Sequence, residues 1–232
     1  MIRKDGFMTG NMIEIASPAD GFVFGAYHVP ARGHRRGGLV LIQEIFGIND
    51  NIKKTCEDFA AQGYEVIAPS MYDRIERGFV TGYDEAGMAR ARKASADTDM
   101  KTAIADVRAC VEFLSPRGKV FFTGYCYGGS ITYIAACRIA GIAAGSGFYG
   151  RLIPDYLGEK PKCPLILHFG DTDPSIPLEG VRRMQAERPE ARVYLYEAGH
   201  GFCSDRPTHF NEKACKLARA RTLDHFARHG AE

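Results

Sequence analysis

A Gly-x-Cys-x-Gly segment at residues 124–128 has the residue types of a strained turn that presents a nucleophile. An apolar run precedes it and a helix-like segment follows it, so Cys126 is expected between a strand and a helix. At the N-terminal end of a helix the dipole favours the thiolate form of a cysteine. The alternative is a buried cysteine in a glycine-rich turn. The segment therefore makes Cys126 a candidate nucleophile.

Two later strand ends supply an acid and a base. Asp171 and Asp173 follow one apolar run, and His200 follows the next. A histidine can move the proton of a nucleophile if a carboxylate fixes its tautomer. We expect Asp173, which precedes Pro174, to orient His200, and Asp171 to cap the loop. The order nucleophile, acid, histidine resembles that of α/β hydrolases.

The first long apolar strand ends in a glutamate, Glu44. A charged side chain at the end of an apolar strand is costly unless it is exposed to solvent, paired with another group or used in the chemistry of a site. In the hydrolase pattern the loop after this strand supplies one amide of an oxyanion hole, and the residue after the nucleophile supplies the other. We therefore expect the backbone N–H groups of Ile45 and Tyr127 in that hole. The alternative for Glu44 is a surface carboxylate that caps Asn49 or the next helix.

Apolar strands alternate with amphipathic helices along the chain, after an opening pair of extended segments that reads as a hairpin. The hairpin strands are expected at Met12–Ala16 and Gly21–Val29. Later strands are expected at Gly38–Gln43, Tyr64–Ala68, Lys119–Thr123, Ala143–Phe148, Pro164–Phe169 and Arg192–Tyr196. Helices are expected at Asn51–Gln62, Asp97–Leu114, Gly128–Ala140, Gly180–Glu187 and Pro207–His225. This alternation predicts an α/β fold with a mostly parallel sheet, helices on both faces and a ligand site at the carboxyl ends of the strands.

The composition is that of one ordinary globular domain, expected to span residues 1–232. Hydrophobic residues make up 45% of the chain and charged residues 25%, which excludes a disordered or disulfide-scaffold protein. The formal net charge of +2 shows no basic excess, so no nucleic-acid partner is expected. No apolar run is long enough to span a bilayer, and no membrane partner is expected.

Five segments together resemble the dienelactone hydrolase family: QEIFGIN (43–49), APSMYDR (68–74), GYCYGG (124–129), GDTDPSIP (170–177) and EAGHGF (197–202). The resemblance implies an α/β-hydrolase fold and a carboxylic ester hydrolase that needs no cofactor or metal. It places the triad on Cys126, Asp173 and His200, and an additional catalytic glutamate on Glu44.

The resemblance also implies a cleft that grips a substrate carboxylate, with Arg74 as its first arginine. The second arginine of the family pattern falls on Ser204 in this chain. Arg206, or Arg151 after the strand-end residue Tyr149, is the expected substitute. The predicted substrate is a small lactone or an activated enol or aryl ester. The sequence does not decide whether this substrate carries a carboxylate.

The implied mechanism forms the thiolate only when substrate is present. Glu44 would hold or accept the proton of Cys126, which protects the sulfur from oxidation. The thiolate would attack the ester carbonyl, and His200 would protonate the leaving oxygen and later activate water. A catalytically silent binding protein and a thiol redox sensor based on Cys126 are the alternatives. The redox sensor is disfavoured because no cysteine lies close to Cys126 in the sequence.

The seven cysteines have no CxxC pair and no zinc-like spacing, so neither a redox dithiol nor a metal site is expected. The N-terminal segment lacks the apolar core of a secretion signal. A cytoplasmic protein, monomeric or a small homo-oligomer, is the simplest expectation.

Overall fold

The computed structural model describes residues 10–232. The chain divides into two compact units, of which the first runs to Val120 and includes Glu232, and the second is Phe121–Ala231. Each unit is described by itself below. The expectation of a single domain stays a prediction.

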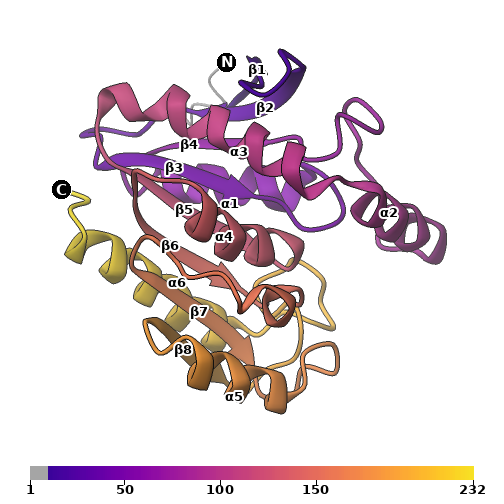
Figure 1. The fold of residues 1–232 in the computed structure, drawn as a ribbon. Coiled ribbons are helices and arrows are strands. Elements are labelled where there is room, and N and C mark those ends of the chain that lie inside the picture. The colour runs from indigo at the N-terminus through magenta and orange to yellow at the C-terminus, as the bar shows by residue number, and fades with distance from the viewer. Residues whose placement is uncertain (1–9) are drawn as a thin grey trace. The chain divides into compact units, whose positions relative to one another are not determined.

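The strands of the first unit are β1 (Asn11–Ala16), β2 (Val23–Val29), β3 (Gly37–Ile42) and β4 (Tyr64–Pro69). They lie in the order β1-β2-β4-β3 (Figure 1). β1 and β2 form the antiparallel hairpin that the sequence predicts, and β2 pairs with β4 antiparallel. β3 and β4 run parallel and are buried along their whole length, which is typical of strands covered on both faces.

The helices of the first unit are α1 (Asp50–Ala60), α2 (Glu85–Asp97) and α3 (Met100–Leu114), followed by the 3-10 turn η1 (Ser115–Arg117). Figure 1 shows α3 and α1 on opposite faces of β3 and β4. The side chain of Asn49 caps α1 by accepting a hydrogen bond from the N–H of Ile52 at 3.1 Å. This cap ends the loop that follows β3 and carries Glu44.

The expected helix Asp97–Leu114 is wrong at its start. α3 begins at Met100, because the Asp99 side chain accepts from the N–H of Thr102 at 2.9 Å and caps the helix there. α2 was not expected at all. Its buried positions are Gly87, Ala91 and Ala94, and residues this small give almost no hydrophobic periodicity in the sequence.

The second unit contains β5 (Val120–Tyr125), β6 (Ile142–Phe148), β7 (Leu165–Gly170) and β8 (Ala191–Tyr196). Their order is β5-β6-β7-β8, and the pairs β6–β7 and β7–β8 are parallel. The carboxyl ends of parallel strands meet at one edge of the sheet. The residues after β5, β7 and β8 are therefore brought to the same edge, as the alternation predicts.

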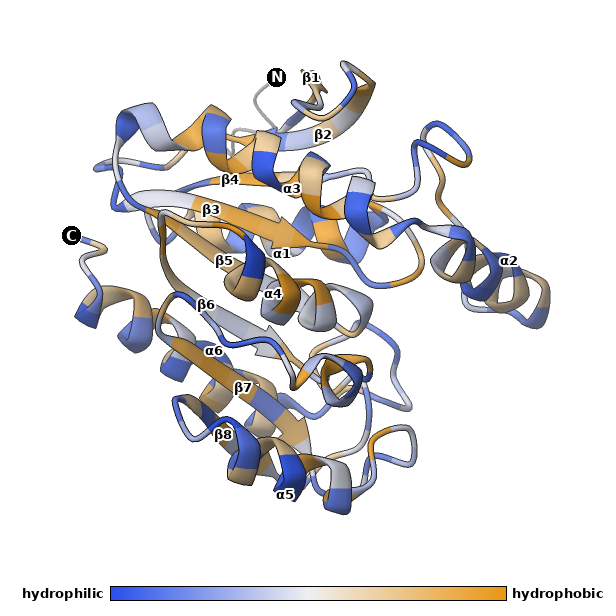
Figure 2. Ribbon diagram, viewed as in Figure 1, coloured by the Kyte–Doolittle hydropathy of each residue, from blue (hydrophilic) through white to orange (hydrophobic). Residues whose placement is uncertain are grey.

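The helices of the second unit are α4 (Tyr127–Arg138), α5 (Leu178–Glu187) and α6 (Glu212–Arg228), with a 3-10 turn η2 (Ile153–Tyr156). α6 begins at Glu212 and not at Pro207, because Asn211 caps it by accepting from the N–H of Ala214 at 3.0 Å. β7 is apolar and buried, and Figure 2 shows it in orange over most of its length. Within residues 10–232, no helix combines the length and apolar character needed to cross a membrane.

Candidate active site

Cys126 occupies the turn between β5 and α4 in a backbone conformation that favours glycine. Its φ is 55°, and its N–H donates to the carbonyl of Phe148 at 3.0 Å. A Cβ on Gly124 would run into the backbone of Gly128. Gly124 is therefore required for this close approach of the chain, and a strained residue such as Cys126 is a frequent feature of active sites.

His200 contacts both Cys126 and Asp173. Its Nε2 lies 3.1 Å from Cys126 Sγ, and its Nδ1 lies 2.7 Å from Asp173 Oδ2. The Asp173 side chain is fully buried, and its second oxygen accepts from the N–H of Ser175 at 2.7 Å. The carboxylate is thus held in one orientation behind the histidine, and the three side chains form a Cys–His–Asp relay at the carboxyl ends of β5, β7 and β8.

The surroundings of His200 favour its protonated form. Burial disfavours the imidazolium, but hydrogen bonds to Asp173 and Cys126 outweigh it and raise the pKa of His200 to about 10. A positive ring next to the sulfur stabilises a thiolate there. The site can therefore supply a nucleophile and a proton donor within one hydrogen-bonded group.

Asp171 lies on the same loop as Asp173 but bonds to backbone groups instead of to His200. Its Oδ1 accepts from the N–H of Ala198 at 3.2 Å, and its own N–H donates to the carbonyl of Tyr196 at 2.9 Å. These bonds join the loops that follow β7 and β8. Asp171 is thus a loop-capping carboxylate, and Asp173 is the one that reaches His200.

The ring of Tyr149 packs against the ring of His200. It has no exposed surface, and its ring centroid lies 5.1 Å from that of His200 and 5.2 Å from that of Phe202. Like Cys126, Tyr149 has a positive φ, at 38°. Because the ring of Tyr149 is covered on all sides, the structure does not favour the expected contact between this side chain and a substrate.

Arg74 does not present an open guanidinium to a substrate. Its Nε and one terminal nitrogen bind Asp106 at 2.8 Å each, and its terminal nitrogens bind Asp20 at 2.8 and 3.0 Å. Its guanidinium also lies over the ring of Phe22, 4.3 Å from the centroid. These carboxylates raise the pKa of Arg74 above its already high ordinary value. The expectation that Arg74 grips a substrate carboxylate is corrected here, because two carboxylates of the chain occupy its donors.

Arg206 is the expected substrate arginine that lies beside His200. Its Nη2 is 3.1 Å from Nδ1 of His209, and His209 Nδ1 is 2.9 Å from the carbonyl of His200. Arg151 is exposed in the turn after β6. Ser204, at the position of the second arginine in the family pattern, is buried next to Gly201. His209 was not predicted, because no recognisable motif surrounds it in the sequence.

Glu44 and Ile45 lie in the loop after β3, and Tyr127 lies at the start of α4. Glu44 is buried directly after β3, so it is not the surface carboxylate of the alternative interpretation. The cap of α1 is supplied by Asn49 itself. Tyr127 is the first residue of α4. The N–H groups of a helix's first turn have no partner within the helix and point outward from its N-terminus. The catalytic role of Glu44 and the oxyanion roles of Ile45 and Tyr127 stay predictions.

Cys203 and Cys215 form a disulfide, with their Cα atoms 5.0 Å apart. Because the chain has no CxxC pair, no redox dithiol was expected, and this disulfide between cysteines far apart in the sequence was not predicted. The two residues are separated by 12 positions, and only the turn between β8 and α6 brings them together. The remaining cysteines are free thiols: Cys56, Cys110, Cys126, Cys137 and Cys163. Among the described residues no group of His, Cys, Asp and Glu side chains could hold a metal ion.

The parallel strands, the strained strand-to-helix turn and the order of nucleophile, acid and histidine define an α/β hydrolase. A dienelactone hydrolase family model matches residues 24–230, and the chain belongs to that family. It is a hydrolase, as the sequence predicts.

Named relatives and solved structures agree with this assignment. The carboxymethylenebutenolidases of Pseudomonas putida and of Pseudomonas knackmussii are each 30% identical over 90% of this chain and 92% of theirs. A Klebsiella pneumoniae structure assigned as a dienelactone hydrolase shares the fold, with a TM-score of 0.82 at 24% identity. It covers 95% of this chain and 99% of its own. The predicted α/β-hydrolase fold is confirmed.

Proposed function

We propose that this protein hydrolyses a lactone or an activated ester through a thiolester formed on Cys126. The observation that carries the proposal is the 3.1 Å contact between Cys126 Sγ and His200 Nε2, with Asp173 behind the ring at 2.7 Å. A nucleophile next to a base that a third group orients is the arrangement of covalent catalysis.

In the first half-reaction, Glu44 takes the proton of Cys126 as substrate binds, and the sulfur attacks the carbonyl carbon of the ester next to the imidazolium of His200. The developing oxyanion accepts hydrogen bonds from the backbone N–H groups predicted for this role, those of Ile45 and Tyr127. The C–O bond to the leaving group then breaks, and the imidazolium of His200 gives its proton to the departing oxygen. The product is a thiolester on Cys126.

In the second half-reaction, His200 takes a proton from water, and the resulting hydroxide attacks the thiolester carbonyl. The C–S bond breaks, the carboxylic acid leaves, and the proton returns to the sulfur. Asp173 stabilises the imidazolium in both halves. The thiolate leaves readily, so the second half needs no further cofactor.

The substrate class follows from the nucleophile and from the relatives. An enol or aryl oxygen departs more readily than a simple alkoxide and suits a thiol nucleophile. The relatives are named carboxymethylenebutenolidases, so an enol lactone is the first candidate. If that lactone carries a carboxylate, Arg206 is the cation that we propose to bind it, because Arg206 lies beside the loop of His200.

Glu44 completes the proposal as the group that accepts the proton of Cys126 when substrate arrives and returns it to the sulfur at the end of the cycle. Its burial is what a proton-holding carboxylate needs. The Glu44→Gln variant tests this role, because it keeps the shape of the side chain and removes its ability to accept the proton. Loss of turnover with retained folding supports the role, and unchanged turnover removes it.

The proposed function is tested with Cys126→Ala and a chromogenic aryl ester. Loss of the nucleophile removes most of the acceleration, so turnover should fall by a factor of about a thousand or more. Mass spectrometry of the wild type during turnover should find an acyl group on Cys126. Cys137→Ala, which removes another free thiol of the second unit, is the control and should keep full activity.

The same experiment separates the alternatives. A silent binding protein shows neither turnover nor an adduct. A thiol sensor shows oxidation of Cys126 without turnover. An alanine variant that keeps the wild-type rate would require another nucleophile.

A further inference from the structure

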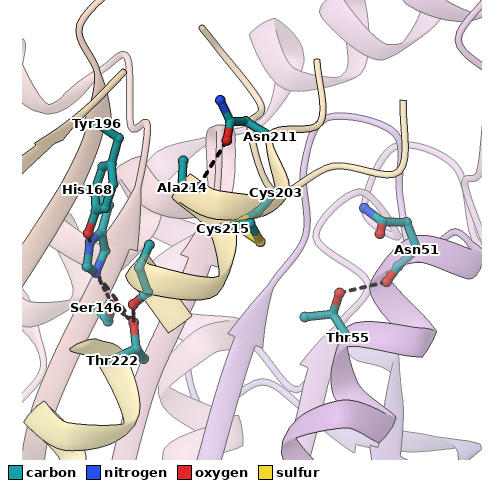
Figure 3. The surroundings of a disulfide bond; sticks show 11 residues. Asn51, Thr55, Ser146, His168, Tyr196, Cys203, Asn211, Ala214, Cys215 and Thr222 are labelled. Atoms are coloured by element: carbon teal, nitrogen blue, oxygen red, sulfur yellow. Dashed lines mark hydrogen bonds between the residues drawn. A yellow bond between two sulfur atoms is a disulfide. The ribbon is translucent and has the colours of Figure 1, made fainter. Parts of the chain in front are cut away.

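The segment between β8 and α6 carries His200 and is fastened to the start of α6. Cys203 lies three residues after the histidine, and its disulfide partner Cys215 lies in the first turns of α6. Both residues of the disulfide are at most 9% exposed. Figure 3 shows the disulfide next to the first turn of α6, where Asn211 caps the helix. A covalent bond therefore ties the catalytic loop to a helix.

Hydrogen bonds fasten the same segment on both sides of His200. The N–H of Asn211 donates to the carbonyl of Phe202 at 3.0 Å, and its side-chain amide donates to the carbonyl of Glu197 at 3.0 Å. Single hydrogen bonds of this kind contribute little net free energy, because the same groups bond to water in the unfolded chain. The disulfide is the strongest link among these contacts.

α6 itself is anchored in the sheet by a buried polar chain (Figure 3). The hydroxyl of Thr222 donates to the carbonyl of Ala218 at 3.0 Å, so it must accept from Ser146 Oγ at 2.7 Å. Ser146 in turn accepts from Nε2 of His168 at 3.1 Å, which leaves Nδ1 to accept from the hydroxyl of Tyr196 at 2.7 Å. This assigns a donor and an acceptor to each hydrogen bond of the buried polar chain. These bonds connect α6 to β6, β7 and β8.

The catalytic loop is therefore clamped to a rigid support. Tyr196, the last residue of β8, is held in the buried chain, and Cys203 is held by the disulfide. His200 lies between these two fixed points. Its contact with Cys126 requires placement to within a fraction of an ångström, because misplacement of a catalytic group by about 1 Å can lower a rate a hundredfold.

We propose that the Cys203–Cys215 disulfide is a redox-controlled positioning element, which holds His200 in contact with Cys126 when oxidised and releases it when reduced. The proposal rests on the proposed function, in which His200 is the base. Reduction by a dithiol transfers two electrons and two protons: the S–S bond breaks, Cys203 and Cys215 become thiols, and the dithiol becomes a cyclic disulfide. Activity then requires one thiol, Cys126, to stay reduced while this pair stays oxidised.

The test compares the Cys203→Ala/Cys215→Ala double variant with a matched Cys137→Ala/Cys163→Ala double variant. The control removes two unbonded cysteines of the same unit. Two quantities are measured at pH 7: kcat on the aryl ester, and the rate at which iodoacetamide alkylates Cys126, read from its tryptic peptide. Both should fall about tenfold in the first variant and stay unchanged in the control. The alkylation rate reports the histidine next to the sulfur, which a loss of folding elsewhere would not mimic.

Wild-type protein provides the second arm. In denaturant the untreated chain should show the five free thiols of the structure, and the chain treated with dithiothreitol should show all seven. The reduced protein, freed of reductant and still folded by circular dichroism, should lose activity and regain it on reoxidation.

Seven thiols in the untreated protein, or full activity with seven thiols, would overturn the proposal. Equal kcat and alkylation rates in the two double variants would do the same. An oxidised wild type without any esterase activity would instead contradict the proposed function, so the two failures are distinguishable.

Discussion

His200 shows how two neighbours can reverse the effect of burial on the pKa of a histidine. Burial alone would favour neutral imidazole, yet the bonds to Asp173 and Cys126 raise the pKa of His200 to about 10. The imidazolium therefore persists from below the ordinary value of 6.5 up to that pH. In the proposed mechanism the imidazolium donates a proton to the leaving group, so the rate should decline as the pH rises through the pKa of His200.

Asp173→Asn should lower both kcat and the pH at which this decline begins. The amide cannot stabilise the imidazolium and favours the wrong tautomer, so kcat should fall about a hundredfold or more. The alkaline limb of the pH–rate profile should move to lower pH because the largest raising contact of His200 is lost. The measurement is kcat/KM for an aryl ester between pH 6 and pH 11.

Asp171→Asn is the matched control, since its carboxylate accepts a hydrogen bond from the backbone of Ala198 and not from His200. It should leave the profile in place. A larger loss at Asp171 than at Asp173 would exchange the roles of the two aspartates.

Arg74 is predicted to matter for stability and not for substrate charge. Arg74→Met leaves the buried carboxylate of Asp106 without its partner, which should lower the free energy of unfolding by about 2 kcal/mol. The ratio of kcat/KM for an anionic ester to that for its neutral methyl analogue should stay unchanged. Arg77→Met, in which a mostly exposed arginine loses its contact with exposed Glu14, should change the stability by less than about 1 kcal/mol. A selective loss on the anionic ester would return Arg74 to the binding site.

At the scale of elements, the close approach of α4 to β6 holds Cys126, the proposed nucleophile, in place. Gly129 lies so near the carbonyl of Phe148 that an added Cβ would collide with backbone atoms. The same carbonyl accepts the N–H of Cys126 at 3.0 Å. Helix packing and the placement of the nucleophile therefore share one backbone group.

Gly129→Ala should separate α4 from β6 and impair both stability and catalysis. Overpacking of this kind lowers the free energy of unfolding by about 2 kcal/mol, and loss of the Cys126 bond should lower kcat about tenfold. Urea unfolding and aryl-ester kinetics measure the two effects. Gly158→Ala is the control, because nothing lies within 4 Å of the Cβ it adds. Retained kcat in a destabilised Gly129→Ala protein would show that the turn is held by other contacts.

At the scale of the whole molecule, acid stability should depend on Glu65 of β4. This glutamate is 3% exposed and binds His28, Arg35 and Arg117 at 2.7 to 2.8 Å. Burial opposes its ionisation, but these three partners lower the pKa of Glu65 to about 2, below the 4.5 of an ordinary glutamate. The stability it contributes is thus present above pH 4.5 and is lost as the pH falls toward 2.

Glu65→Gln should lower the free energy of unfolding by about 2 kcal/mol at pH 7. The difference from wild type should shrink as the pH falls from 4.5 toward 2, because the wild-type carboxyl is increasingly protonated in that range. Glu14→Gln, at an exposed position, should show neither effect. Chemical unfolding at pH 7, 5 and 3 measures this difference, and a constant gap between wild type and variant would refute the linkage. The cytoplasmic location and the monomer or small homo-oligomer stay predictions at this scale.

Local pattern alone determined much of this protein. The alternation of apolar strands and helices, the glycines around Cys126 and the strand-end positions of Asp173 and His200 follow from neighbouring residues. Periodicity and turn chemistry are local properties, so they can be read without the fold. Helix boundaries were wrong where a cap such as Asp99 or Asn211 overrode the pattern.

Tertiary structure decided which side chains pair. Asp173 and not Asp171 meets His200, Arg74 is occupied by Asp20 and Asp106, and Cys203 bonds to Cys215. Each of these pairs joins residues whose distance depends on the path of an intervening loop or helix, which residue types and spacing do not specify. A carboxylate, a guanidinium or a thiol can serve equally well in a site or in the scaffold, and only the partner that the fold brings within bonding distance decides which.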